Sequence, residues 1–170
     1  MSGNSKGYSY LQVTLHWAIA ALVFYQLVFG EDIKRYHRAL DKYLTEGGDA
    51  PSTATVIGGN LHIYIGVAIL ALVVIRLALR LTVGVPASVP GPALQVKAGE
   101  ALHWLFYLLL FAMPVTGLLA QYTTLPVGEL HEAGQPAFIV LIVVHAGAAL
   151  YHHFLLKDST LMRMLKPGTV

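Results

Sequence analysis

The sequence contains no cysteine among its 170 residues. Disulfides, iron–sulfur clusters, thiolate metal ligands and the Cys-x-x-Cys-His attachment of a covalent haem are therefore excluded. Metal chemistry in this chain must rest on histidine, carboxylate or methionine side chains. Histidine is the first of these to locate, because eight histidines occur in a very apolar chain.

Charge is also scarce, since 12% of the residues are charged and 56% are hydrophobic. A soluble domain carries about 25% charged residues, so the composition indicates a membrane protein. The formal net charge is only +2 and the basic residues are scattered, which argues against nucleic acid as a partner. Residues 1–6 lack the basic region and cleavage site of a signal peptide, so we expect the first hydrophobic segment to be retained.

Four apolar segments are long enough to cross a bilayer, which takes about 20 helical residues. The predicted spans cover about residues 9–30, 58–81, 101–122 and 131–156. We therefore predict an all-α membrane protein, a four-transmembrane-helix bundle forming a single domain over residues 1–170. Pro114 predicts a kink in the third span. Apolar residues at helical spacing within residues 31–55 predict a short amphipathic helix on the membrane surface.

The distribution of lysine and arginine predicts the orientation, because these residues favour cytoplasmic flanks. Four of them lie in the first loop between spans, and the third loop has none. Seven lie on the side of the two termini: Lys6, Arg76, Arg80, Lys97, Lys157, Arg163 and Lys166. We expect a multi-pass protein of the bacterial inner membrane with both termini in the cytoplasm.

The last predicted span carries two histidines, His131 and His145, fourteen residues apart. On an α-helix this spacing separates them by about 21 Å along the axis and by only about 40° around it. One helix therefore offers two imidazoles on one face, near opposite sides of the bilayer. Two cofactors stacked across a membrane would be held in such positions.

Histidines of the other spans meet these two at matching depths. With alternating helix directions, His62 reaches the level of His131, in the periplasmic half. Two such layers fit bis-histidine ligation of b-type haem, in which imidazoles from facing helices approach the iron from both sides. The cytoplasmic layer holds three deep candidates, and His152 is a fourth that lies at the interface. The spacing does not decide which two of His16, His103 and His145 would ligate the haem iron.

Neighbouring residues fit the same interpretation. Gly66 and Gly134, together with the alanines after His145, leave room for a flat macrocycle between helices. Arg76 lies fourteen residues after His62 on nearly the same face, and a haem propionate is a natural partner for an arginine within a span.

Each of these signals also has a structural explanation. Histidines within spans form interhelical hydrogen bonds or relay protons, small residues favour helix packing, and arginines extend to the interface. We expect His37, on the surface helix, to be only polar surface. The agreement of four histidines in depth and face is what favours two haems.

Several motifs carry a family resemblance. They are LQVTLHW at residues 11–17, LHIYIG and VVIRLALRL in the second span, ALHWLFYLLLFAMPVTGL in the third, and HEAG and HAGAALYHHFLLKDSTLMRML at the end. The sequence resembles the prokaryotic cytochrome b561 family, and within it the members that pass electrons from superoxide to ubiquinone. The resemblance covers nearly the whole chain except the first loop, which is longer here, and the proline-rich connection.

The resemblance implies the ligands and the cofactors. His16 and His145 would ligate a cytoplasmic haem b, and His62 and His131 a periplasmic one. The acceptor would be ubiquinone, near the cytoplasmic haem. Four residues would bind the quinone or move its protons: Trp17, Arg80, His103 and His152.

The function that follows is electron transfer from periplasmic superoxide to ubiquinone. Superoxide is an anion, and the first loop offers a steering field from Lys34, Arg35, Arg38 and Lys42. The alternative for this cluster is a solvated face, balanced by Glu31, Asp32, Asp41 and Glu46. A second hypothesis is a cytochrome b subunit that links a periplasmic protein partner to the quinone pool. A third is a haem-free membrane protein, such as a small transporter whose histidines relay protons.

Overall fold

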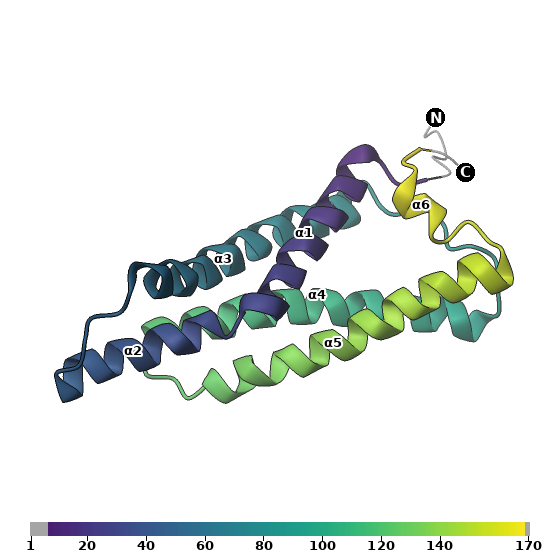
Figure 1. The fold of residues 1–170 in the computed structure, drawn as a ribbon. Coiled ribbons are helices and arrows are strands. Elements are labelled where there is room, and N and C mark those ends of the chain that lie inside the picture. The colour runs from purple at the N-terminus through teal and green to yellow at the C-terminus, as the bar shows by residue number, and fades with distance from the viewer. Residues whose placement is uncertain (1–6, 169–170) are drawn as a thin grey trace.

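The computed structural model describes residues 7–168, which form helices joined by short connections (Figure 1). The helices are α1 Tyr10–Phe29, α2 Asp32–Glu46, α3 Thr53–Thr82, α4 Ala93–Tyr122, α5 Gly128–Tyr151, the π-helical turn η1 His152–Leu156, and α6 Met162–Leu165. The segments long and apolar enough to cross a membrane are α1, α3, α4 and α5 continued through η1. This architecture confirms the predicted all-α class with four membrane-spanning helices.

Three helices begin earlier than the predicted spans: α3, α4 and, by a smaller margin, α5 at Gly128. α3 starts at Thr53 because Ser52 caps it, its hydroxyl accepting a hydrogen bond from the Thr55 amide at 3.3 Å. α4 starts at Ala93, directly after Pro92. The apolar pattern that marks a span ignores these polar first turns, so it underestimates helix length. Lys6, one of the basic residues that predict the orientation, lies outside the described residues.

Local signals fix the start of α1 and the end of α2. Ser9 and Gln12 form a reciprocal capping box, with hydrogen bonds of 3.2 and 3.0 Å. The predicted amphipathic helix is present as α2, and it ends at Gly47 in the left-handed conformation, φ 66°.

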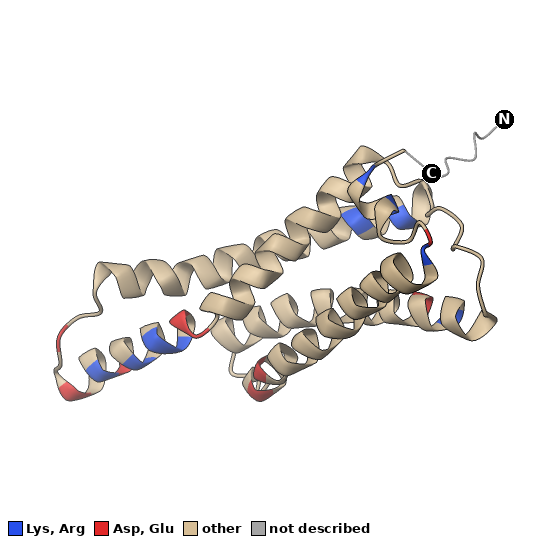
Figure 2. Ribbon diagram, turned by 45° about the vertical axis from the view of Figure 1, so that its right-hand side comes forward, with Lys and Arg blue, Asp and Glu red and all other residues tan. Residues whose placement is uncertain are grey.

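The bundle is built from neighbouring helix pairs. α1 packs on α3, α3 on α4 and α4 on α5, while α2 lies against α3 beyond the end of α1 (Figure 1). Charged residues gather at the two ends of the bundle and leave its middle uncharged (Figure 2). This distribution is what a bilayer requires of helices that span it.

The buried core lies between the two histidine levels. Its members come from all four spans: Ile19, Val23, Ile69, Val73, Tyr107, Leu110 and Phe138. Phe138 stands midway between His131 and His145 in α5, and Val73 is completely buried. Many other apolar side chains face outward, such as Phe24 at 69% exposed. An apolar partition therefore separates the two ends of the bundle.

Candidate functional site

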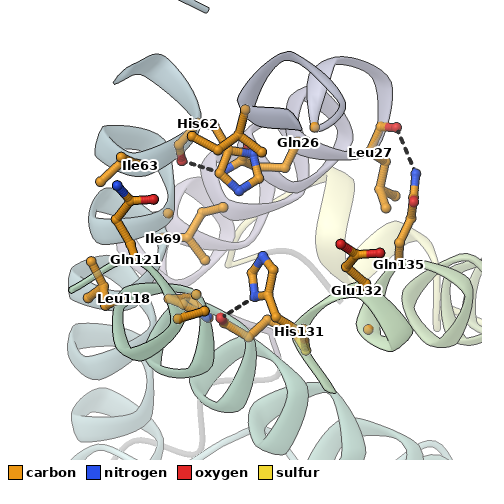
Figure 3. A pocket seen from close by; sticks show the side chains of 18 of the residues that line it. Gln26, Leu27, His62, Ile63, Ile69, Leu118, Gln121, His131, Glu132 and Gln135 are labelled. Carbon is orange, nitrogen blue, oxygen red and sulfur yellow. Dashed lines mark hydrogen bonds between the residues drawn. The ribbon is translucent and has the colours of Figure 1, made fainter. Parts of the chain in front are cut away.

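His62 of α3 and His131 of α5 face one another across a cavity at the α2 end of the bundle. Their ring centres are 6.0 Å apart, and the two rings point toward each other (Figure 3). The cavity has a volume of about 350 Å³ and is lined by α1, α2, α3, α4 and α5. The structure thus brings together two histidines that lie far apart in the sequence.

A hydrogen bond selects one tautomer of the neutral His131 ring. Its Nδ1 lies 2.9 Å from the backbone carbonyl oxygen of Met113, which can only accept, so Nδ1 carries the hydrogen and Nε2 keeps its lone pair. A metal-binding imidazole needs this arrangement. Nδ1 of His62 is buried and has no hydrogen-bond partner among the described residues.

Small residues shape the cavity in different ways. A Cβ atom on Gly117 would lie 2.8 Å from Cε1 of His131, so only glycine leaves this ring its place. Gly134 lines the cavity and also leaves space for the side chain of Met113, which a Cβ atom there would meet. Gly66 lines the cavity, and a Cβ there would meet only Nε2 of Gln26, at 3.7 Å.

The basic residues of α2 differ in how far they are neutralised. Lys34 contacts Glu132 of α5 at 3.0 Å and Glu31 at 3.4 Å. The hydrogen bond to Glu132, followed by that to Glu31, raises the pKa of Lys34 above its ordinary value.

Of the other three basic residues of α2, one has an acidic partner among the described residues. Arg35 pairs with Asp32 at 2.9 Å. Arg38 and Lys42 form no ion pair within residues 7–168. Of the four basic residues expected to steer an anion, Lys34 and Arg35 thus have acidic partners, and Arg38 and Lys42 have none among the described residues.

The second histidine cluster lies at the opposite end of the bundle. The ring of His145 is 6.2 Å from that of His16 and 5.6 Å from that of His103, measured between ring centres. The structure therefore brings together all three deep candidates of this layer, and both possible partners remain within reach of His145.

The guanidinium group of Arg76 forms a hydrogen bond within the chain. Its Nη1 donates to the backbone carbonyl of Gln12 at 2.8 Å, one turn before His16. The Gln12 side chain in turn donates to the carbonyl of Gly84 at 2.9 Å. Arg76 thus ties α3 to α1 beside the His16 level, and its other guanidinium nitrogens make no hydrogen bond within the described chain.

The residues expected near the quinone have separate immediate partners. Trp17 packs edge-on against His16, with ring centres 5.3 Å apart, and its Nε1 donates to the Met164 carbonyl at 2.8 Å. Arg80 lies over two aromatic rings of α4, 5.2 Å from the Trp104 ring centre and 5.8 Å from that of Tyr107. His152 contacts Asp158, with 2.5 Å between Nδ1 and Oδ2.

The geometry of both histidine pairs fits b-type haem. A metal–imidazole bond is about 2 Å long and a ring centre lies about 1.2 Å from its nitrogen, so two imidazoles that held one metal ion between them would have ring centres roughly 6.4 Å apart. The observed separations are 6.0 Å for His62 and His131 and 6.2 Å for His16 and His145. The two pairs lie at the two ends of the apolar partition.

Sequence reasoning missed several residues of the site. His37 is exposed, as expected of polar surface, but it also lines the cavity together with His62. The Met113 carbonyl leaves no trace in the residue pattern, because any residue supplies one. A better signal existed for Asp158, which belongs to the KDSTLMRM motif already noted for its resemblance.

Comparisons with known proteins agree with this arrangement. A sequence model described as prokaryotic cytochrome b561 matches residues 7–167. Cytochrome b562 of Cereibacter sphaeroides is 37% identical, covering 96% of this chain and 98% of the relative. A probable superoxide oxidase, CybB, of Yersinia pestis is 30% identical, covering 94% and 96%. Cytochrome b561 homolog 1 of Escherichia coli is 28% identical over 93% of this chain and 96% of the relative.

Proposed function

Because the chain belongs to the prokaryotic cytochrome b561 family, it is a bacterial membrane electron-transfer cytochrome with b-type haem, and we propose that it passes electrons from superoxide to ubiquinone. Superoxide would be oxidised at the α2 end and ubiquinone reduced at the end that carries α6. The overall reaction consumes two superoxide ions, one ubiquinone and two protons, and yields two dioxygen molecules and one ubiquinol. The observation that supports it best is the pair of opposed histidines at each end of one bundle.

Two haems b are proposed, one for each pair. His62 and His131 would hold the first, His16 and His145 the second, and Arg76 would bind a propionate of the second. His16 and His103 both lie within reach of His145, with ring centres 6.2 Å and 5.6 Å away. The resemblance to the prokaryotic cytochrome b561 family supports His16 as the partner. When bound, each haem iron accepts and releases one electron.

The residues of α2 prepare the donor end. Arg38 and Lys42 are the basic residues there without an acidic partner among the described ones, so they supply the field that attracts an anion. The ion pair of Lys34 with Glu132 joins α2 to α5 at the rim of the cavity. The probable superoxide oxidase from Yersinia pestis supports superoxide as the donor.

The acceptor end is proposed around Trp17, Arg80, His103 and His152. Trp17 is 47% exposed and Trp104, which carries Arg80 on its face, is 49% exposed. Exposed aromatic side chains near the end of a span suit a lipid-soluble quinone that enters from the bilayer. The proposed orientation places this end, with both termini, in the cytoplasm of a bacterium whose inner membrane holds the protein.

The test supplies superoxide to the purified protein under anaerobic conditions with a soluble ubiquinone. We expect rapid appearance of the reduced haem bands, followed by one ubiquinol for every two superoxide ions. A variant lacking both haems, His62→Ala with His16→Ala, serves as the control. Haem reduction no faster than the uncatalysed decay of superoxide would contradict the proposed donor.

A protein donor is the second candidate, and one observation favours it. α2 extends beyond the end of α1 and carries exposed charge, such as Arg35 at 66% side-chain exposure (Figures 1 and 2). Such a surface suits docking. Quinol formation that requires a periplasmic fraction and not superoxide would select this candidate.

A further inference from the structure

The chain after the last span folds back over the end of the bundle at which α1 begins. We name residues 157–168 the terminal strap. Arg163 donates to the Ala87 carbonyl at 2.6 Å, the Trp17 side chain donates to Met164 at 2.8 Å, and the Gly168 amide donates to Tyr8 at 3.0 Å. The strap therefore joins η1, the connection between α3 and α4, and the start of α1 (Figure 1).

The strap begins with a tight reversal that returns Asp158 to His152. Lys157 adopts the left-handed conformation, φ 54°, which is unusual for a residue with a side chain. The amides of Lys157 and Asp158 both donate to the carbonyl of His152 and stabilise this turn. Its effect is to place Oδ2 of Asp158 2.5 Å from Nδ1 of His152, while Oδ1 accepts from the Thr160 amide at 2.9 Å.

The contact fixes which nitrogen of His152 exchanges protons. Burial by itself would raise the pKa of Asp158, but the hydrogen bonds from His152 and Thr160 outweigh it and lower the pKa below its ordinary value. An ionised carboxylate accepts only, so Nδ1 of His152 carries a hydrogen in both charge states of the ring. Proton exchange therefore takes place at Nε2. The His152 side chain is 26% exposed and keeps access to solvent.

The same strap also holds Trp17, a second side chain of the proposed quinone region. Its hydrogen bond to Met164 keeps the indole at the far end of the strap, beside His16. Two side chains from different helices, Trp17 and His152, are thus positioned by one short segment. No hydrogen bond joins either of them to the core of the bundle within residues 7–168.

We propose that Asp158 is a positioning residue for ubiquinone reduction, holding His152 so that Nε2 delivers protons to the quinone. The inference rests on the proposed function. The two electrons come from two superoxide ions, each of which leaves as dioxygen. The quinone takes up two protons, each donated from His152 Nε2 to a quinone oxygen and replaced from water at the same end of the bundle.

The test uses the intact protein with both haems, reduced by stoichiometric dithionite and mixed rapidly with a soluble ubiquinone. In Asp158→Asn the amide group turns a donor toward Nδ1 and favours the opposite tautomer. We expect the limiting rate of haem oxidation to fall roughly 10- to 100-fold, with the quinone KM unchanged and both haem bands intact. Asp158→Glu should recover most of the rate.

Two further variants separate positioning from folding of the strap. Ser159→Ala alters the same turn, but the Ser159 side chain makes no hydrogen bond in the described chain, so its rate should equal that of the wild type. In the double variant His152→Gln with Asp158→Asn, the rate should match that of His152→Gln alone, because Asp158 acts through His152.

The outcomes distinguish the two proposals. If reduced wild-type protein is not oxidised by ubiquinone, the proposed acceptor is wrong and the positioning role falls with it. If the wild type reacts and Asp158→Asn reacts within twofold of it, the positioning role alone is overturned. Equal slowing of Asp158→Asn and Ser159→Ala, without recovery in Asp158→Glu, would also overturn it.

Discussion

At the residue scale, the site depends on single atoms that have no sequence signature. His131 owes its ring orientation to a backbone carbonyl, and its position to the missing side chain of Gly117. The histidines themselves were visible in the sequence because their spacing places them at two depths. Their surroundings were not, since helix periodicity gives depth and face and leaves contacts between helices undetermined.

Gly117→Ala tests how tightly His131 is placed. The added Cβ would lie 2.8 Å from the ring, and overpacking of this kind costs about 1–3 kcal/mol. We expect haem at this site to bind roughly 5- to 150-fold more weakly, as measured by haem titration of the apoprotein. Gly99→Ala is the control, because a Cβ there meets no atom within 4 Å and the residue does not line the cavity. Equal binding in both variants would show that the His131 ring tolerates displacement.

Glu132→Gln tests the charge balance at the rim of the cavity. The carboxylate of Glu132 is the first cause of the raised pKa of Lys34, so its removal lowers that pKa but leaves Lys34 protonated at neutral pH. The freed cation should raise the rate constant for haem reduction by superoxide roughly two- to fivefold at low salt. The gain should disappear at high ionic strength. An unchanged rate at low salt would remove Lys34 from steering.

Acid pH tests the contact between Asp158 and His152. The folded pKa of Asp158 lies below its unfolded value of 3.8, so its contribution to stability is present above pH 3.8 and is lost as the pH falls through the folded pKa. The difference in melting temperature between wild type and Asp158→Asn should shrink below about pH 4. A difference that persists at lower pH would locate the effect elsewhere.

At the element scale, α2 shows what a periodic pattern can and cannot reveal. Its amphipathic spacing predicted a helix, and the helix is present. The pattern placed it on the membrane surface, whereas it also packs on α3 and contributes to the cavity wall. Gly58 and Gly59 permit this approach, but two adjacent glycines in a sequence do not identify their partner.

Gly59→Ala should weaken the packing of α2. The new Cβ would lie 2.8 Å from Cβ of Tyr36, so the two helices must separate. We expect faster hydrogen exchange across α2, by roughly 10-fold for a loss of about 1.4 kcal/mol. Gly99→Ala in α4 provides the control, because a Cβ there meets no atom within 4 Å. Hydrogen exchange in Gly59→Ala as slow as in the wild type would mean that α2 does not depend on the close approach of Tyr36 to Gly59.

At the scale of the whole molecule, four apolar helices were predictable because a bilayer demands about 20 residues for each crossing. Which helices pack together was less predictable. α1 packs on α3, and α4 packs on α5, so each histidine pair joins the half formed by α1 and α3 to the half formed by α4 and α5. The fold itself thus provides facing imidazoles at both ends, with an apolar core between them.

The most direct test of this account counts haem in purified variants and records their reduced-minus-oxidised spectra. The wild type should contain two haems per chain. His62→Ala and His131→Ala should each lose the same haem, His16→Ala and His145→Ala the other, while His37→Ala and His103→Ala keep both. A single haem in the wild type, or loss of haem in His103→Ala without loss in His16→Ala, would contradict the proposed pairs.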